Sequence, residues 1–177
     1  HEDGGIFSYA TPHKGLQGDA YWLPKRMAKD IDNCGNQNVV VQVQSDQEPA
    51  IVNVQEEIRI LRKGRAIFTI SPVGESDSTG RAENAVKRVQ AKFRALRSDL
   101  QEKLGRKIDV SKPFGSWLIR WAGEVLTKYT KGDTGKTAWE KRRGKPCDKP
   151  IAKIGEKVLY LPLKTASAHT NKAEAKM

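Results

Sequence analysis

Two β-branched segments, separated by one helical segment, constrain the fold of this chain most strongly. Residues 38–46 (NVVVQVQSD) alternate between apolar and polar, as strands do, and residues 65–73 (RAIFTISPV) form a second segment of this kind. Between them, Glu48-Pro49 suits the first turn of a helix that continues to about Lys63. Proline is tolerated there because the N–H groups of the first turn have no partner within the helix. The residues that helical spacing would turn toward the core are Ile51, Val54, Ile58 and Leu61.

The residues before this unit predict a further strand and helix. Residues 5–12 (GIFSYATP) alternate weakly and end at a proline, which favours a short strand. Residues 19–35 place apolar side chains near helical spacing, with Asp19 as a candidate N-cap and Gly35 just past the end. The resulting order, β-α-β-α-β, is typical of an α/β domain.

The longest helical pattern follows a polar segment, residues 74–80 (GESDSTG), which we expect to form a loop. One apolar stripe at 3-4-4 spacing runs through Val86, Val89, Phe93, Leu96, Leu100 and Leu104. Gly105 is expected to stop this helix. Its N-terminal half carries six Arg or Lys residues between Arg81 and Arg97 against the single acid Glu83. Such a face suits a nucleic-acid contact, and a solvated basic surface explains it equally well.

The remaining segments predict a helical and strand-containing extension. Residues 112–130 form an amphipathic pattern whose expected inward side chains are Trp117, Leu118, Trp121 and Val125. Residues 131–136 (KGDTGK) indicate a loop and residues 137–146 a short helix and turn. Residues 155–163 (GEKVLYLPL) predict a strand, and the tail 164–177 lacks an apolar pattern and is expected to be disordered.

Composition narrows the class of partner. The 177 residues suit one ordinary domain, and no run approaches the roughly 18 to 20 apolar residues of a membrane span. The formal net charge of +11 makes nucleic acid the leading partner. Cys34 and Cys147 have no metal-ligand spacing around them, which argues against a structural zinc or a disulfide. We therefore expect an intracellular protein, nuclear or cytoplasmic.

Two carboxylates stand out once common catalytic patterns are removed. Residues 130–137 do not satisfy the phosphate-binding loop pattern, and the three histidines offer no Ser/His/Asp arrangement. Asp46 ends a strand, where α/β sheets bind ligands, and Glu83 begins the basic helix. Each also has a structural explanation, Asp46 as a helix cap and Glu83 as a favourable charge near a helix N-terminus.

The context of these two acids resembles a known family. SDQEPAI (45–51), FTISP (68–72) and DSTGRAENAVKR (77–88) are similar to the catalytic core of retroviral and copia-like retrotransposon integrases, members of the RNase H-like superfamily. Asp46 matches the second catalytic aspartate of that family and Glu83 its catalytic glutamate. The 36 residues between them fit the family's spacing of about 35.

The resemblance covers roughly residues 5–163. It implies an RNase H-like sheet flanked by helices, with an integrase core at residues 1–130, a post-core helix and strand extension at 131–163 and a disordered tail at 164–177. The family uses a first aspartate on an opening strand, and no residue of this chain matches it. We therefore expect an N-terminally truncated core whose first strand is missing.

The implied chemistry is metal-dependent phosphodiester transesterification. In the family, the aspartates and the glutamate hold two Mg²⁺ or Mn²⁺ ions about 4 Å apart. Asp46 and Glu83 would be the catalytic and metal-binding residues here, binding metal weakly without the first aspartate. Arg81, Lys87, Arg88 and Arg94 would bind phosphates of retroelement ends and target DNA. A homo-oligomer would be consistent with the family's multimeric action.

Three readings therefore stay open. The first is a polynucleotidyl transferase core for DNA integration, catalytically incomplete as this chain. The second is a non-catalytic nucleic-acid-binding or dimerising remnant that kept the scaffold and the basic helix. The third is a basic RNA- or ribosome-binding protein, which lacks support because no aromatic-rich or GXXG signature occurs.

Overall fold

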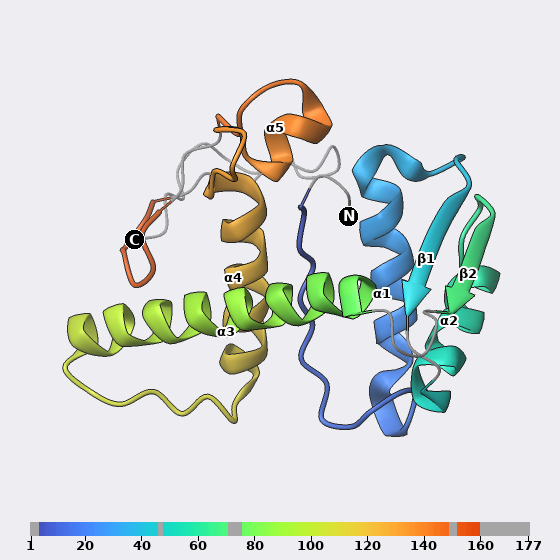
Figure 1. Cartoon of the computed structure of the whole chain (residues 1–177). Coiled ribbons are helices and arrows are strands. Elements are labelled where there is room, and N and C mark those ends of the chain that lie inside the picture. Colours follow the sequence, from blue (N-terminus) through green and yellow to red (C-terminus); the bar gives the residue numbers. More distant parts are fainter. Residues whose placement is uncertain (1–3, 46–47, 71–75, 149–151, 160–177) are drawn as a thin grey trace, which may run out of the picture.

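The chain folds into five α-helices and one small parallel sheet within the residues that the computed structural model describes, which are 4–45, 48–70, 76–148 and 152–159. Figure 1 shows the sheet at one edge of the molecule and the longest helix, α3, crossing α4 on the other side. None of the helices in the described ranges is both long enough and apolar enough to cross a membrane.

The sheet forms as the β-branched segments predict. Strands β1 (Val41–Ser45) and β2 (Ala66–Ile70) pair in parallel, with Val41 opposite Ala66 and Ser45 opposite Ile70. Helix α2 (Pro49–Leu61) connects them and begins at the predicted proline. Because parallel strands need such a crossover, the β1-α2-β2 order confirms the α/β interpretation of this unit.

Helix α2 turns a narrower face to the core than its spacing predicts. Val54 and Ile58 are buried, at 7% and 2% exposed, whereas Ile51 and Leu61 are 39% and 40% exposed. The prediction that all four face inward was therefore half wrong. Val54 and Ile58, in the middle of the apolar stripe, are the residues that pack with Ala28 of α1.

Helix α1 (Trp22–Ile31) packs against α2 and carries the other half of the first apolar cluster. Ala28 of α1 meets Val54 and Ile58 there. A 3-10 turn, η1 (Gly18–Tyr21), precedes α1, so Asp19 lies inside that turn and is not the N-cap of either helix. A π-turn, η2 (Asp32–Asn36), follows α1, with Gly35 at φ +90°, where glycine avoids the strain of a side chain.

Helices α3 (Ser76–Leu104) and α4 (Pro113–Tyr129) form the second apolar cluster. Val89 of α3 packs with Ala122 and Leu126 of α4, and Leu118 of α4 is fully buried. The predicted loop 74–80 is helical from Ser76 onward, while residues 71–75 lie outside the described ranges. Gly105 ends α3 at φ +63°, as predicted.

The inward face of α4 differs from the predicted one. Leu118, Ala122 and Leu126 are buried, whereas Trp117 is 48% exposed and stacks on the half-buried Trp121. Helix α4 lies close to α3, and small or aliphatic side chains such as Ala122 and Leu126 fit that contact better than the large indole rings do. The prediction for Leu118 is confirmed and that for Trp117 is wrong.

Residues 5–12 do not form the predicted strand. They run extended along α4 (Figure 1), where the Ile6 N–H donates to Thr127 Oγ1 at 2.8 Å and Ser8 Oγ donates to Ile119 O at 2.7 Å. A Cβ on Gly123 would collide with Ser8 Oγ, so glycine permits this close approach. An extended segment becomes a strand only beside another strand, and here its neighbour is a helix.

The C-terminal part is one short helix and an irregular segment. Helix α5 (Ala138–Arg143) begins at a capping box in which Thr137 Oγ1 accepts from the Glu140 N–H at 3.0 Å and Glu140 Oε2 accepts from the Thr137 N–H at 2.6 Å. Residues 155–159 of the predicted strand are irregular, and no strand among the described residues lies beside them. Residues 160–163 and the tail lie outside the described ranges.

Candidate nucleic-acid interface

The carboxyl ends of the two strands lie together at one edge of the sheet. Ser45 and Ile70 are register partners and are the last residues of β1 and β2. Ser45 Oγ accepts a short hydrogen bond from Gln55 Nε2, which ties this edge to α2. Asp46 follows Ser45 directly in the sequence, but it lies outside the described residues, as does Ser71-Pro72.

Glu83 lies about two turns inside α3, not at its beginning. The helix starts at Ser76, so seven residues precede Glu83 and its carboxylate is exposed to solvent. The helix macrodipole favours acids mainly within the first turn. The structural explanation of Glu83 as a helix-end charge therefore loses most of its basis.

The predicted DNA-binding residues occupy two opposite sides of α3. At about 100° per residue, Lys87 and Arg94 lie within about 40° of Glu83 around the helix axis. Arg81 and Arg88 lie about 140° to 160° away from it. All four cationic side chains are exposed. The helix therefore brings Lys87 and Arg94 to the side of Glu83, and it separates Arg81 and Arg88 from that side.

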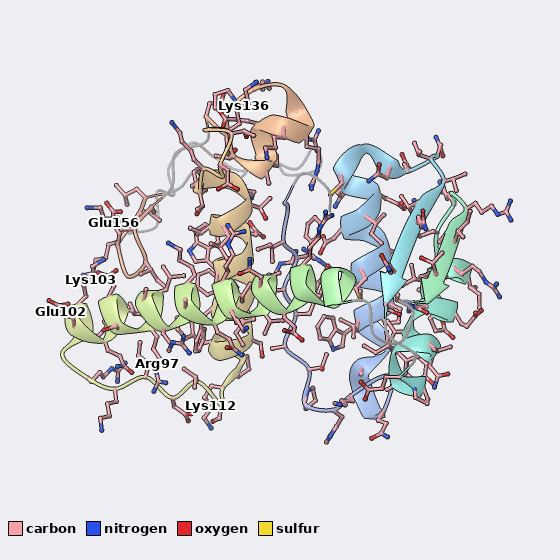
Figure 2. The ribbon with its side chains drawn as sticks, in the orientation of Figure 1. Arg97, Glu102, Lys103, Lys112, Lys136 and Glu156 are labelled. Carbon is pink, nitrogen blue, oxygen red and sulfur yellow. The ribbon has the colours of Figure 1, made fainter. Side chains whose placement is uncertain are left out.

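Two further cations of α3 are less available to an external anion. Lys92 is partly buried, and Arg97 Nε donates to Gln101 Oε1 at 3.1 Å. The same oxygen accepts from the Ile108 N–H at 3.1 Å, so it secures the turn that follows α3. Figure 2 shows Arg97 on the side of α3 from which that turn leaves. Arg97 thus contributes to local structure as well as to charge.

Among the described residues, no group of three His, Cys, Asp or Glu side chains is placed to hold a metal ion. Of the two predicted metal ligands, only Glu83 belongs to that part of the chain. An exposed carboxylate is a suitable ligand for Mg²⁺, which prefers oxygen donors. One such donor alone does not make a metal site.

A buried acid that sequence reasoning missed lies between the N-terminal segment, α1 and α4. Asp30 has a side chain 7% exposed, and its Oδ2 accepts from Tyr9 at 2.8 Å, from Arg26 at 3.1 Å and from Arg120 at 3.4 Å. Burial and the bond to Asp30 raise the pKa of Tyr9 far above its ordinary value. These contacts join the N-terminal segment to α1 and α4, beside a cavity of about 290 Å³.

The basic run 141–145 (KRRGK) is partly committed to packing. Arg142 Nη1 donates to Cys34 Sγ at 2.9 Å, and its guanidinium lies 5.9 Å from the centre of the Phe7 ring. Arg143 Nη2 donates to Asn33 O at 2.8 Å and lies over the ring of Trp139. Both arginines hold α5 against the end of α1, which no local pattern in the run indicates.

The fold is similar to a known catalytic core. A search of solved structures matches the catalytic core domain of BIV integrase, with a TM-score of 0.50 and 17% sequence identity, over 79% of this chain and 78% of that one. A scan of protein-family models and a search of curated proteins both find no match. At this level of identity the likeness concerns the fold. The chain therefore has a mixed helical and parallel-sheet fold similar to a retroviral integrase core.

Proposed function

We propose that this chain is an integrase core of retroelement origin, with an RNase H-like fold, which binds DNA and contributes to phosphodiester transesterification. The similarity of fold to the catalytic core domain of BIV integrase over 79% of the chain carries the proposal. The ordered motifs around Asp46 and Glu83 also support it.

Asp46 and Glu83 are the proposed ligands of Mg²⁺ or Mn²⁺. Asp46 follows the last residue of β1, at the strand end where α/β folds bind ligands, and Glu83 projects into solvent from α3. A divalent cation held by such carboxylates stabilises negative charge on the oxygens of a phosphodiester. Together the two carboxylates would orient that cation toward bound DNA.

Lys87 and Arg94 are the proposed phosphate contacts beside Glu83. They share its side of α3, so a duplex whose phosphate backbone reaches Glu83 would meet both cations. Contacts of this kind depend on salt and carry little sequence information, which suits insertion at many targets. Arg81 and Arg88 face away and would contact a different part of the DNA or the general ionic atmosphere.

Metal binding tests the proposal without requiring turnover. Mn²⁺ binding, measured by electron paramagnetic resonance or calorimetry, should weaken at least tenfold in Glu83→Gln and in Asp46→Asn. Glu102→Gln removes an exposed acid of the same helix, far from Glu83 at the other end of α3 (Figure 2), and should leave Mn²⁺ binding unchanged. Equal binding in all three variants would contradict the assignment.

Strand transfer tests the chemistry itself. The assay compares this chain with a version extended upstream by a strand that supplies an aspartate, because the family uses three carboxylates. The extended protein should join DNA ends in Mg²⁺ or Mn²⁺, and Glu83→Gln should reduce the rate at least a hundredfold. If the extended protein is inactive and Glu83→Gln alters neither metal nor DNA binding, the enzymatic proposal fails.

The alternative function is a non-catalytic DNA-binding remnant. Exposed cations on both sides of α3 favour it, because such a helix can bind duplex DNA without any metal. In that case duplex DNA binding persists in a chelator and Asp46→Asn and Glu83→Gln bind DNA as tightly as the unaltered chain.

A further inference from the structure

A large groove lies at the opposite end of α3 from Glu83. It has a volume of about 930 Å³, within the range of about 300 to 1,000 Å³ that ligand-binding clefts occupy. The C-terminal end of α3, the turn after it, α4 and residues 152–156 form its walls. Lys103 Nζ donates to Ile154 O at 3.1 Å, which fixes the last wall to α3. Figure 2 shows Lys103 and Glu156 at this end of the molecule.

Three stacked aromatic rings line the groove. Phe114, Trp117 and Trp121 follow one another along one side of α4, with ring centres 5.5 Å and 5.8 Å apart and the two indoles inclined by only 7°. Trp117 is 48% exposed. Trp121 is half-buried, so the exposed part of the aligned pair belongs mainly to Trp117 and offers an aromatic surface to flat groups.

The rim of the groove is positively charged. Four cations, Arg106, Lys107, Lys128 and Lys153, lie around it against two acids, Asp109 and Glu156.

Both acids are engaged by neighbouring groups. Asp109 Oδ1 accepts from the N–H and hydroxyl of Ser111, which lowers the pKa of Asp109, and Glu156 Oε2 accepts from the Lys153 N–H. No hydrogen bond or ion pair within the described residues engages the side chains of Arg106 and Lys107. Lys128 pairs with Glu124 at 2.8 Å, so Arg106 and Lys107 are the cations most available to an anion.

We propose that this groove binds single-stranded DNA. Its unpaired bases can pack against the exposed part of the Trp117–Trp121 pair, and its phosphates match the charge of Arg106 and Lys107. Duplex DNA keeps its bases inside the stack and cannot use the indole surface. Leu100, Leu104 and Ile108 supply aliphatic contacts beside the rings, and the choice of DNA over RNA rests on the proposed function. This inference does not depend on the proposed metal site.

Binding of a ten-residue oligodeoxythymidine to the whole chain tests the stacking contact, by tryptophan fluorescence and by anisotropy of a labelled oligomer. Trp117→Ala should weaken binding about 5- to 100-fold, and Trp117→Phe should retain part of it. Trp22→Ala is the matched control, because Trp22 is 44% exposed and lies on α1, outside the groove. It should change binding less than twofold. Unchanged melting temperatures separate lost binding from lost folding.

The salt dependence tests the charged rim. Arg106→Gln with Lys107→Gln should reduce the slope of log K against log salt by about 1.4, since each phosphate contact of a single strand contributes about 0.7. Lys25→Gln with Lys29→Gln, two exposed cations of α1, is the control of equal charge. Its slope should stay within about 0.3 of the unaltered chain.

Three outcomes would overturn the inference. Trp117→Ala could bind the oligomer as Trp22→Ala does, an oligouridine could bind more tightly than the oligodeoxythymidine, or an acidic peptide with aromatic residues could displace the oligomer at lower concentration. Binding of duplex DNA is a fourth measurement, and Trp117→Ala should leave it unchanged because duplex bases are not free to contact the ring. An equal loss for duplex and single strand would also contradict stacking as the basis of binding.

Discussion

At the scale of single residues, Asp30 makes more side-chain contacts than any predicted site residue that the structure describes. Its carboxylate accepts from a tyrosine and two arginines that come from three separate segments. Glu83, by contrast, is exposed and leaves the fold little dependent on it. A buried, multiply bonded acid stabilises structure, whereas an exposed acid on a helix is available to a ligand.

Replacing Asp30 by Ala should lower the free energy of unfolding by about 2 to 4 kcal/mol, because two arginines and a tyrosine lose their acceptor. The side chains of Arg26 and Arg120 are 39% and 29% exposed, so water can replace part of the hydrogen bonding that they lose. Urea unfolding provides the measurement. Asp99→Ala, which removes an exposed pair with Lys103, should cost less than about 1 kcal/mol. A similar loss of unfolding free energy in both variants would mean that the buried network stabilises the fold no more than an exposed ion pair does.

The pH dependence of stability should report on Tyr9. The pKa of Tyr9 is raised in the folded protein, so its neutral hydroxyl stabilises the fold below about pH 10, where the unfolded side chain is also neutral. Above about pH 10 the unfolded state loses the proton first, and this stabilisation is lost as pH rises toward the folded pKa.

Tyr9→Phe isolates this effect, since every other titrating group is shared. At pH 8, the free energy of unfolding of the unaltered chain should exceed that of Tyr9→Phe by about 1 kcal/mol. That difference should shrink by up to about 1.4 kcal/mol per pH unit above pH 10. Urea unfolding at pH 8, 10 and 11 measures it, and a difference that stays constant with pH would be contrary to the expected linkage.

At the scale of elements, local signals worked where the controlling interactions are local. Proline begins α2 at Pro49, Gly105 ends α3, and Thr137 with Glu140 begins α5, each within the segment expected. The strand predicted at residues 5–12 failed for the opposite reason. Its alternation is compatible with a sheet, but the element that it meets is α4, which no pattern inside the segment specifies.

The capping box of α5 gives a prediction at this scale. Thr137→Ala removes the acceptor for the Glu140 N–H and should lower the free energy of unfolding by about 1 kcal/mol. Thr137→Ser keeps the hydroxyl and should recover most of that loss. Thermal unfolding followed by circular dichroism compares the two. Equal destabilisation by Ala and Ser would point to the lost methyl group, since Thr137 is buried, and not to the cap.

At the scale of the whole molecule, α3 connects two surfaces of different character. Its N-terminal half carries Glu83 with exposed cations, and its C-terminal end forms one wall of the aromatic groove. Glu83 and Leu100 are 17 residues apart on this helix, roughly 25 Å at 1.5 Å per residue, whereas Arg94 is six residues from Leu100, or about 9 Å. Duplex and single-stranded DNA could therefore be held by separate parts of the same rigid element.

The two sides of α3 should contribute unequally to duplex binding near Glu83. Lys87→Gln with Arg94→Gln should reduce the slope of log K against log salt by about 1.8 on a short duplex, because each phosphate contact contributes about 0.9. Arg81→Gln with Arg88→Gln removes the same charge from the opposite side and should change the slope by less than half as much. Equal slopes for the two pairs would contradict binding on the side of Glu83.

The sequence by itself determined most of the helical segments, where several of them begin and end, and the order β1-α2-β2, because periodicity, caps and breakers act over a few residues. It missed the first turn of α3, where residues 76–80 were expected to form a loop. It also pointed to an integrase-like core through the motifs around Asp46 and Glu83. The helical spacing of α3 also follows from the sequence, and it places Lys87 and Arg94 on the side of Glu83. Only the tertiary structure decided that residues 5–12 run along α4 and not in a sheet, since the partner of an extended segment is not specified within that segment. Burial is likewise set by the neighbouring elements, which is why Trp117 is exposed and Leu118 buried one residue later.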